Sequence, residues 1–167
     1  SPLRTLAGGV DASVQAPGLP LFFERAYLQP LSGRLETGAL GRGWRHNWQM
    51  SLATRDDGTV VVSDPGGMLR IFQPDGRYSG RYLAGPGDNG RMRAAGGGYL
   101  LTEADGRIQF FGSDGKLGYV EDTNGNRITC GYTDDGLTEL THSSGPTLTL
   151  AYNGEGRIAT ITDGHGR

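Results

Sequence analysis

The residues of this sequence with the greatest potential for metal binding or nucleophilic chemistry are three histidines and one cysteine. His46, His142 and His165 are far apart in the sequence, and no cysteine lies beside them, whereas the ligands of a zinc site usually cluster at short spacing. Cys130 occupies an inward position in an alternating run of residues, where a buried and inert thiol is the usual finding. The sequence therefore predicts no metal centre and no catalytic thiolate, and it leaves a functional role open only for His46.

Two short motifs resemble ligand-binding loops without completing them. Residues 85–90 spell G-x-G-x-x-G, but the proline inside them and the three glycines that soon follow argue against the helix that a dinucleotide site needs. Residues 122–126 place side-chain oxygens at alternate positions, as a calcium loop does, yet Arg127 and Thr133 stand where Gly and Glu are required. We interpret the motifs as a plain loop and a hairpin turn. No carboxylate pair suited to glycoside chemistry stands out, so the sequence predicts no cofactor, no metal and no enzymatic activity.

A cluster of aromatic residues in the first third of the chain could contact a ligand or close one end of a sheet. Period-two alternation places its second half on one face together with Met50 and Leu52, and it explains more positions than helical spacing does. The alternatives are a sugar-stacking platform and core packing, of which we favour core packing. The candidate residues are Phe22, Phe23, Tyr27, Trp44, His46 and Trp48.

The elements that must position these residues are short strands separated by turns. From residue 105 onward, Asp-Gly, Asn-Gly and similar pairs recur between apolar-alternating runs, ending with Gly164-His165-Gly166. Such pairs supply the positive φ angles of two-residue hairpin loops. Tyr132 and Gly136 recur 20 residues later as Tyr152 and Gly156, and a fixed period of this kind indicates a repeat architecture.

The predicted fold class is all-β, with consecutive antiparallel β-hairpins forming a curved sheet strip. We expect an irregular lead-in at residues 1–20, an opening β region at 21–98 that a loop-rich segment (80–98) interrupts, and hairpin repeats at 99–167. One face should be apolar and the other polar. The expected inward residues are Ile108 and Phe110; Ile128, Cys130 and Tyr132; and Leu148, Leu150 and Tyr152.

The composition restricts partners and cellular location only partly. The chain has 167 residues, 30 of them glycine, and a net charge of −2. Because the basic residues are scattered along the sequence, it predicts no nucleic-acid surface. A single cysteine excludes an internal disulfide, and neither an 18-residue apolar stretch nor a signal-peptide pattern occurs. The first residue is Ser1 and the last is Arg167, where another strand would begin, so we expect a piece of a longer protein.

Several of these motifs together resemble the YD repeats of bacterial Rhs proteins, toxin-complex C proteins and animal teneurins. The resemblance covers nearly the whole chain from about residue 10. The segments that carry it are 22–27 (FFERAY), 38–46 (GALGRGWRH), 57–67 (DGTVVVSDPGG), 122–129 (DTNGNRIT) and the two tyrosine–glycine units at 132–141 and 152–162.

The resemblance implies a strip of hairpins that spirals into a hollow shell around a C-terminal toxin domain. The expected partners are then further repeats and the toxin cargo of the same parent chain. The expected location is outside the producing cell, by secretion or through a bacterial secretion system, with the cell surface as another possibility. The alternative function is a cell-surface module that binds glycans or proteins.

The last predicted strand, residues 157–162, would present an open row of backbone hydrogen-bonding groups. Unpaired edges of this kind recruit other strands. Ile158 and Ile161 are expected on opposite faces of the strand. We therefore expect the isolated chain to associate with itself edge to edge.

Overall fold

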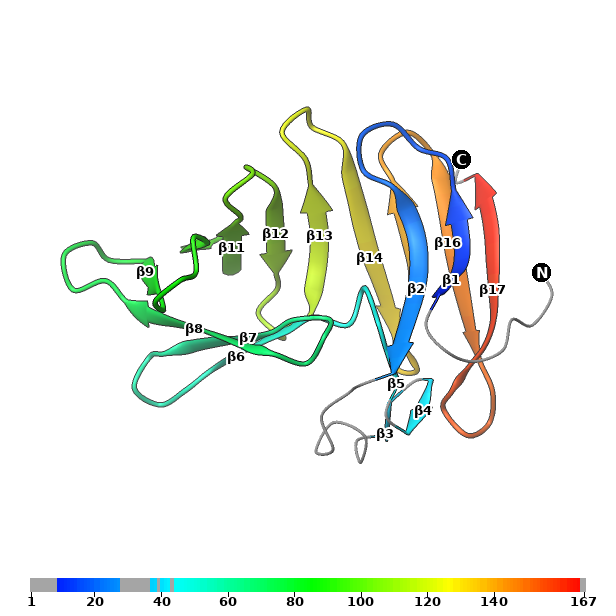
Figure 1. The fold of residues 1–167 in the computed structure, drawn as a ribbon, viewed down its shortest axis with the longest axis horizontal. Helices are drawn as coiled ribbons and strands as arrows, with labels where there is room; N and C mark the ends of the chain where they lie inside the picture. Colours follow the sequence, from blue (N-terminus) through cyan, green and yellow to red (C-terminus); the bar gives the residue numbers. More distant parts are fainter. Residues whose placement is uncertain (1–8, 28–36, 39, 43, 166–167) are drawn as a thin grey trace.

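The computed structural model describes residues 9–27, 37–38, 40–42 and 44–165. The described residues contain no helix, and their strands form one large sheet and two small ones (Figure 1). The three-stranded sheet has the order β1 (Gly9–Val14), β2 (Leu21–Tyr27), β5 (Trp44–His46), and the two-stranded sheet consists of β3 (Thr37–Gly38) and β4 (Gly41–Arg42). The prediction of an all-β chain is confirmed.

The large sheet is a twelve-stranded meander in which each strand pairs antiparallel with its neighbours in the sequence. It therefore confirms the predicted run of consecutive hairpins, and it is not closed into a barrel. Its strands are β6 (Ser51–Thr54), β7 (Val60–Ser63), β8 (Leu69–Pro74), β9 (Arg81–Ala84), β10 (Arg91–Ala95), β11 (Gly98–Thr102), β12 (Ile108–Phe111), β13 (Leu117–Glu121), β14 (Arg127–Thr133), β15 (Gly136–His142), β16 (Pro146–Tyr152) and β17 (Ile158–His165).

The sheet curls, so that β6 reaches the turn between β12 and β13. The amide of Leu52 donates to the carbonyl of Gly115 over 2.8 Å, and Ser51 forms a bridge with Lys116. The Gly115 φ angle is +81°, and a Cβ atom there would collide with the Leu52 carbonyl. Glycine is thus required at this position both for the turn and for the close approach of β6.

Most of the hairpins use a three-residue loop rather than the predicted two-residue loop. In the β11–β12 turn the Gly106 amide donates to the Glu103 carbonyl, and the Glu103 amide donates to the Arg107 carbonyl. This pattern, with Gly106 at φ +91°, is that of a type I turn followed by a glycine bulge. A two-residue loop does join Thr133 to Gly136. The positions of most turns were predicted correctly because the same Asp-Gly pair fits both loop lengths.

The 20-residue period is visible in a repeated tyrosine contact. The hydroxyl of Tyr132 donates to the Leu117 carbonyl over 2.8 Å, and that of Tyr152 donates to the Leu137 carbonyl over 2.7 Å. Each tyrosine therefore links its own strand to the preceding strand, through the backbone carbonyl of the residue 15 positions earlier in the sequence.

Two segments that were predicted to be irregular form strands. Within residues 1–20, β1 pairs with β2 despite a bulge between Val10 and Ala12, and Pro17 and Pro20 lie after the strand, in the segment that joins β1 to β2. Within residues 80–98, β9 and β10 pair with each other. These strands are only four and five residues long, which is too short for a clear alternation pattern.

Two predictions of facing, in β12 and through residues 44–52, were wrong. In β12 the buried residues are Gln109 and Phe111, not Ile108 and Phe110, and a bulge follows Phe110. The expected continuous alternation through residues 44–52 is broken, because a turn at Asn47 carries the chain from β5 of the small sheet to β6 of the large one.

The C-terminal strand also differs from expectation. Ile158 and Ile161 pair with Tyr152 and Leu150 across a bulge, and both pack against the core rather than on opposite faces. Gly164 and the residue after it continue β17 and do not form the predicted turn. For β14 and β16 the facing was correct, since Ile128, Cys130, Leu148 and Leu150 are buried and Tyr132 and Tyr152 are half-buried.

The three-stranded sheet packs over the face of the large sheet formed by its last strands. Figure 1 shows β1 and β2 lying across β14–β17, and β1 and β2 contact β16. Leu21 and Phe23 of β2 are fully buried and belong to the same core as the inward residues of the large sheet. Nε2 of His142 lies 3.0 Å from the Pro17 carbonyl in the β1–β2 turn, so a polar contact adds to this packing.

Candidate binding site between the two sheets

A cavity of about 350 Å³ lies between the three-stranded sheet and the large sheet. Phe22 and Trp48 line it from the small-sheet side, and Leu117, Val120 and Ile128 line it from β13 and β14. Charged residues of two turns and of β8 also line it; they are Asp64, Arg70, Glu103 and Arg107. The cavity therefore combines an apolar wall with a polar region, as small-ligand sites commonly do.

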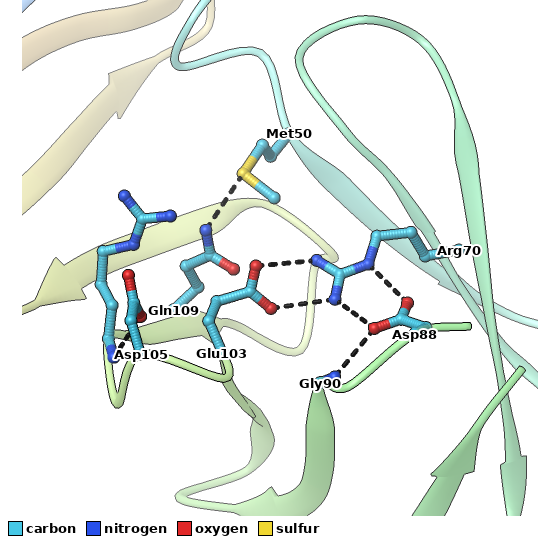
Figure 2. Close-up of polar contacts among 8 residues, drawn as sticks. Met50, Arg70, Asp88, Gly90, Glu103, Asp105 and Gln109 are labelled. Atoms are coloured by element: carbon cyan, nitrogen blue, oxygen red, sulfur yellow. Dashed lines mark hydrogen bonds and ion pairs between the residues drawn. The ribbon is translucent and has the colours of Figure 1, made fainter. Parts of the chain in front are cut away.

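Arg70 of β8 holds together two loops that are distant in the sequence (Figure 2). Its Nε and Nη2 atoms donate to Asp88 over 2.8 Å each, and its Nη1 and Nη2 atoms donate to Glu103 over 3.1 and 2.9 Å. Asp88 also accepts the Gly90 amide over 2.8 Å. Both carboxylates are thus held in bidentate pairs, which are the strongest geometry for arginine.

The charges of this network stabilise one another. The hydrogen bonds that Arg70 donates to Asp88 lower the pKa of that carboxyl group. Donation to Asp88 and to Glu103 raises the pKa of Arg70 despite its partial burial. The Arg70 side chain is 19% exposed, and its donors are occupied by the two carboxylates. The G-x-G-x-x-G segment (85–90) therefore has a structural contact, because its Asp88 binds Arg70 of β8.

Gln109 of β12 lines the cavity, and one of its buried polar atoms has no hydrogen-bond partner among the described residues. The residue is 6% exposed, and its Nε2 atom donates to the Met50 sulfur over 3.8 Å (Figure 2). Its Oε1 atom is buried without a hydrogen-bond partner among the described residues. A buried unpaired acceptor costs about 1–3 kcal/mol, so a ligand that brings an N–H or O–H group into the cavity would recover this energy.

The described members of the aromatic cluster form packed contacts rather than an exposed platform. The rings of Phe23 and His46 lie 4.9 Å apart between centroids. The Trp48 amide donates to Nδ1 of His46 over 3.2 Å, and the Trp48 indole donates to the Phe22 carbonyl over 2.6 Å. His46 and Trp48 are each 7% exposed, and burial, followed by the charge of Arg45, lowers the pKa of His46 to about 4.

The other two candidates of this cluster lie outside the described side chains. The backbones of Tyr27 and Trp44 face each other in the pairing of β2 with β5. Phe22 is half-buried and lines the cavity. The structure thus brings Phe22, Phe23, His46 and Trp48 together at the junction between the two sheets.

The remaining candidates serve packing and turn geometry. Burial raises the pKa of the Cys130 thiol to about 12, so the thiol stays protonated near neutral pH. Asp122 accepts hydrogen bonds from the amides of Asn124 and Asn126 and from the Asn126 side chain, so the segment that resembles a calcium loop is a closed hairpin turn. Among the described residues, no group of three or more His, Cys, Asp or Glu side chains could hold a metal ion.

Comparison with protein-family models gives a match to the first part of the chain. Residues 5–72 are similar to a family whose model is described as a domain of unknown function, DUF6531, and the match covers less than half of the chain. It spans β1 to β7 and part of β8. No curated protein matches the chain. In the part of the chain that the structure describes, no helix is long and apolar enough to cross a membrane.

Sequence reasoning missed the residues that give this cavity its polar character. Arg70 and Glu103 line the cavity, and Asp88 holds Arg70 in place from outside it. The three residues come from different turns and strands, and no short motif joins them. Gln109 was missed because β12 was assigned the opposite facing. Its place two residues before the aromatic Phe111 was the one available signal, since residues two apart in a strand share a face.

Proposed function

We propose that this chain is a structural module of an Rhs/YD-repeat protein, part of a β-shell that encloses a C-terminal toxin domain for delivery. The observation that supports this most is the meander, in which every strand of the large sheet pairs with its sequence neighbours. Such a sheet can be lengthened at β17 one hairpin at a time, without rearranging the strands already formed. The tyrosine contact links β14 to β13 and β16 to β15 in the same way, and we expect further hairpins to repeat it.

In this proposal the work of the chain is physical and not catalytic. The partners are further repeats and the enclosed polypeptide of the parent chain, and no cofactor takes part. The protein would act after secretion, after delivery by a bacterial secretion system, or at the cell surface. The sequence resemblance supports this assignment.

Limited proteolysis of the natural protein that contains this chain tests the proposal. A domain downstream of the repeats should survive protease in the intact protein and be digested after Leu140→Ala, which removes a fully buried side chain of β15. Leu83→Ala provides the matched control, because Leu83 is 51% exposed. Digestion of the downstream domain in the intact protein as fast as in the Leu140→Ala variant, with the repeats themselves still resistant, would rule out enclosure.

The β17 edge offers a second test. Within the described residues, β17 is the last strand of the sheet and pairs only with β16, so its other edge can accept a strand. Light scattering of the isolated chain should show a mass that rises with concentration, and a chain lengthened by the next repeat should show less of this rise. A strictly monomeric chain that behaves like the lengthened one would contradict the edge prediction.

A cell-surface module that binds glycans or proteins is the second candidate function. The unpartnered Gln109 Oε1 in a cavity lined by Phe22 and Trp48 favours it, because a sugar hydroxyl could donate to that oxygen. A glycan array separates the two functions. Binding that Gln109→Leu abolishes, and that Gln73→Leu on the exposed face of β8 preserves, would establish the second function in place of the first.

A further inference from the structure

Three arginines gather on the outer face of β9 and β10. Arg81 and Arg93 face each other directly in the strand register, and Arg91 lies two residues from Arg93 on the same face. All three are exposed, and together with Thr102, the register partner of Arg91, they line a cavity of about 450 Å³. We call Arg81, Arg91 and Arg93 the arginine face.

The arginine face carries more positive charge than the carboxylates near it balance. Like charges directly opposite each other in a sheet are destabilising, and among the described residues no carboxylate forms an ion pair with any of the three. Residues 75–93 contain four arginines and two aspartates. Both aspartates form ion pairs with other arginines, Asp75 with Arg77 and Asp88 with Arg70. Asp75 also lines the cavity beside Arg81, so a single carboxylate stands against the three charges of the arginine face.

An aromatic ring borders the same surface. Tyr78 is 53% exposed, and the guanidinium groups of Arg77 and Arg81 lie 5.6 and 5.2 Å from its ring centroid. These contacts orient Arg81 beside Arg93 without neutralising either charge. The positive charge is local, because the whole chain has a net charge of −2.

We propose that the arginine face binds the sulfate or phosphate groups of a polyanionic ligand. Guanidinium groups present several N–H donors in a plane, which suits the oxygens of such groups. One oxyanion between Arg81 and Arg93 would replace their repulsion with attraction across the strand pair. Binding should therefore also stabilise the protein against unfolding. The proposal does not depend on the shell function.

Calorimetry and thermal melting of the full chain test the proposal with two probes, a heparin-derived sulfated oligosaccharide and linear polyphosphate. At least one should bind, raise the melting temperature and bind more weakly at higher salt; the tighter probe identifies the source of the oxyanion. The double variant Arg81→Gln/Arg93→Gln should weaken binding roughly tenfold or more. Arg157→Gln removes one arginine charge from the exposed β16–β17 turn and should leave binding unchanged, whereas Arg81→Gln alone, which also removes one charge, should weaken it.

A second variant separates binding from folding. Arg93→Glu places a carboxylate opposite Arg81, so the ligand-free protein should melt at a higher temperature while binding of either probe is lost. Three results would overturn the proposal: no binding of either probe, equal weakening by Arg157→Gln, or poly-glutamate binding as tightly as the better probe. An unchanged or lower melting temperature of Arg93→Glu without ligand would contradict the proposed repulsion.

Discussion

The strands β13–β16 and the strands β8–β12 belong to one sheet but are stabilised differently. In β13–β16 each strand buries two apolar side chains, which are Leu117 and Val120, Ile128 and Cys130, Leu137 and Leu140, and Leu148 and Leu150. In β8–β12 no strand buries more than one; those present are Phe72, Met92, Leu101 and Phe111. The second region adds the bidentate contacts of Arg70 with Asp88 and Glu103.

This difference shows what a hairpin strip needs where apolar alternation is sparse. Regular strands gain their stability from buried area, which is roughly proportional to apolar surface removed from water. Short strands joined by glycine-rich turns bury less of that surface. In β8–β12, the ion pairs of Arg70 with Asp88 and Glu103 supply part of the stabilisation that apolar burial does not provide. The comparison predicts that the same kind of substitution will have different effects in the two regions.

The largest expected effect is the loss of a buried leucine in the regular region. Leu140 is fully buried, so Leu140→Ala should lower the free energy of unfolding by about 2–5 kcal/mol. The same substitution at Leu83 of β9, which is 51% exposed, should change it by less than about 0.5 kcal/mol. Urea denaturation monitored by far-UV circular dichroism measures both changes. Equal losses in the free energy of unfolding for Leu140→Ala and Leu83→Ala would contradict the claim that the two regions are stabilised differently.

The next effect is the loss of the Arg70 network. Arg70→Met keeps the length of the side chain but leaves the carboxylates of Asp88 and Glu103 without their cation, which should cost about 1.5–3 kcal/mol. Arg157→Met is the matched control, because its pair with Glu155 is exposed and such pairs contribute about 0–1 kcal/mol. A loss no larger than that of the control would mean that apolar burial alone holds β8–β12.

Acid should weaken the protein in two steps. Burial lowers the pKa of His46 to about 4, so the unfolded state binds more protons between pH 6.5 and 4, and stability should fall as the pH decreases through that range. The hydrogen bonds from Arg70 lower the pKa of Asp88, so its contribution is present above the ordinary Asp value of about 3.9 and is lost below it. The free energy of unfolding measured from pH 2 to 8 tests both steps, and Arg70→Met should reduce only the second.

The smallest effect concerns the repeated tyrosines. Tyr132→Phe and Tyr152→Phe each remove one hydroxyl that donates to a backbone carbonyl, so each should cost about 0.5–1.5 kcal/mol. Because the two contacts are equivalent under the 20-residue period, the two losses should agree closely. If denaturant titrations gave clearly different losses in the free energy of unfolding for the two variants, the two tyrosine contacts would share a geometry but not a contribution to stability.

Sequence reasoning succeeded where local pattern and packing agree. The alternation of Ile128, Cys130, Leu148 and Leu150 predicted their burial, and the Asp-Gly pairs located most turns. It failed at β12, where Gln109 takes an inward place because the strand register, and not polarity, decides its facing. The Arg70 network could not be predicted, because its partners lie 18 and 33 residues away in the sequence and meet only when the sheet folds.

Cryo-electron microscopy of the natural protein that contains this chain tests the central claim most directly. The account predicts that the meander continues beyond β17 as further hairpins and that the strip closes into a shell with density for a downstream domain inside it. A sheet that ends at β17 without a further strand, with the downstream domain outside and exposed to solvent, would contradict it.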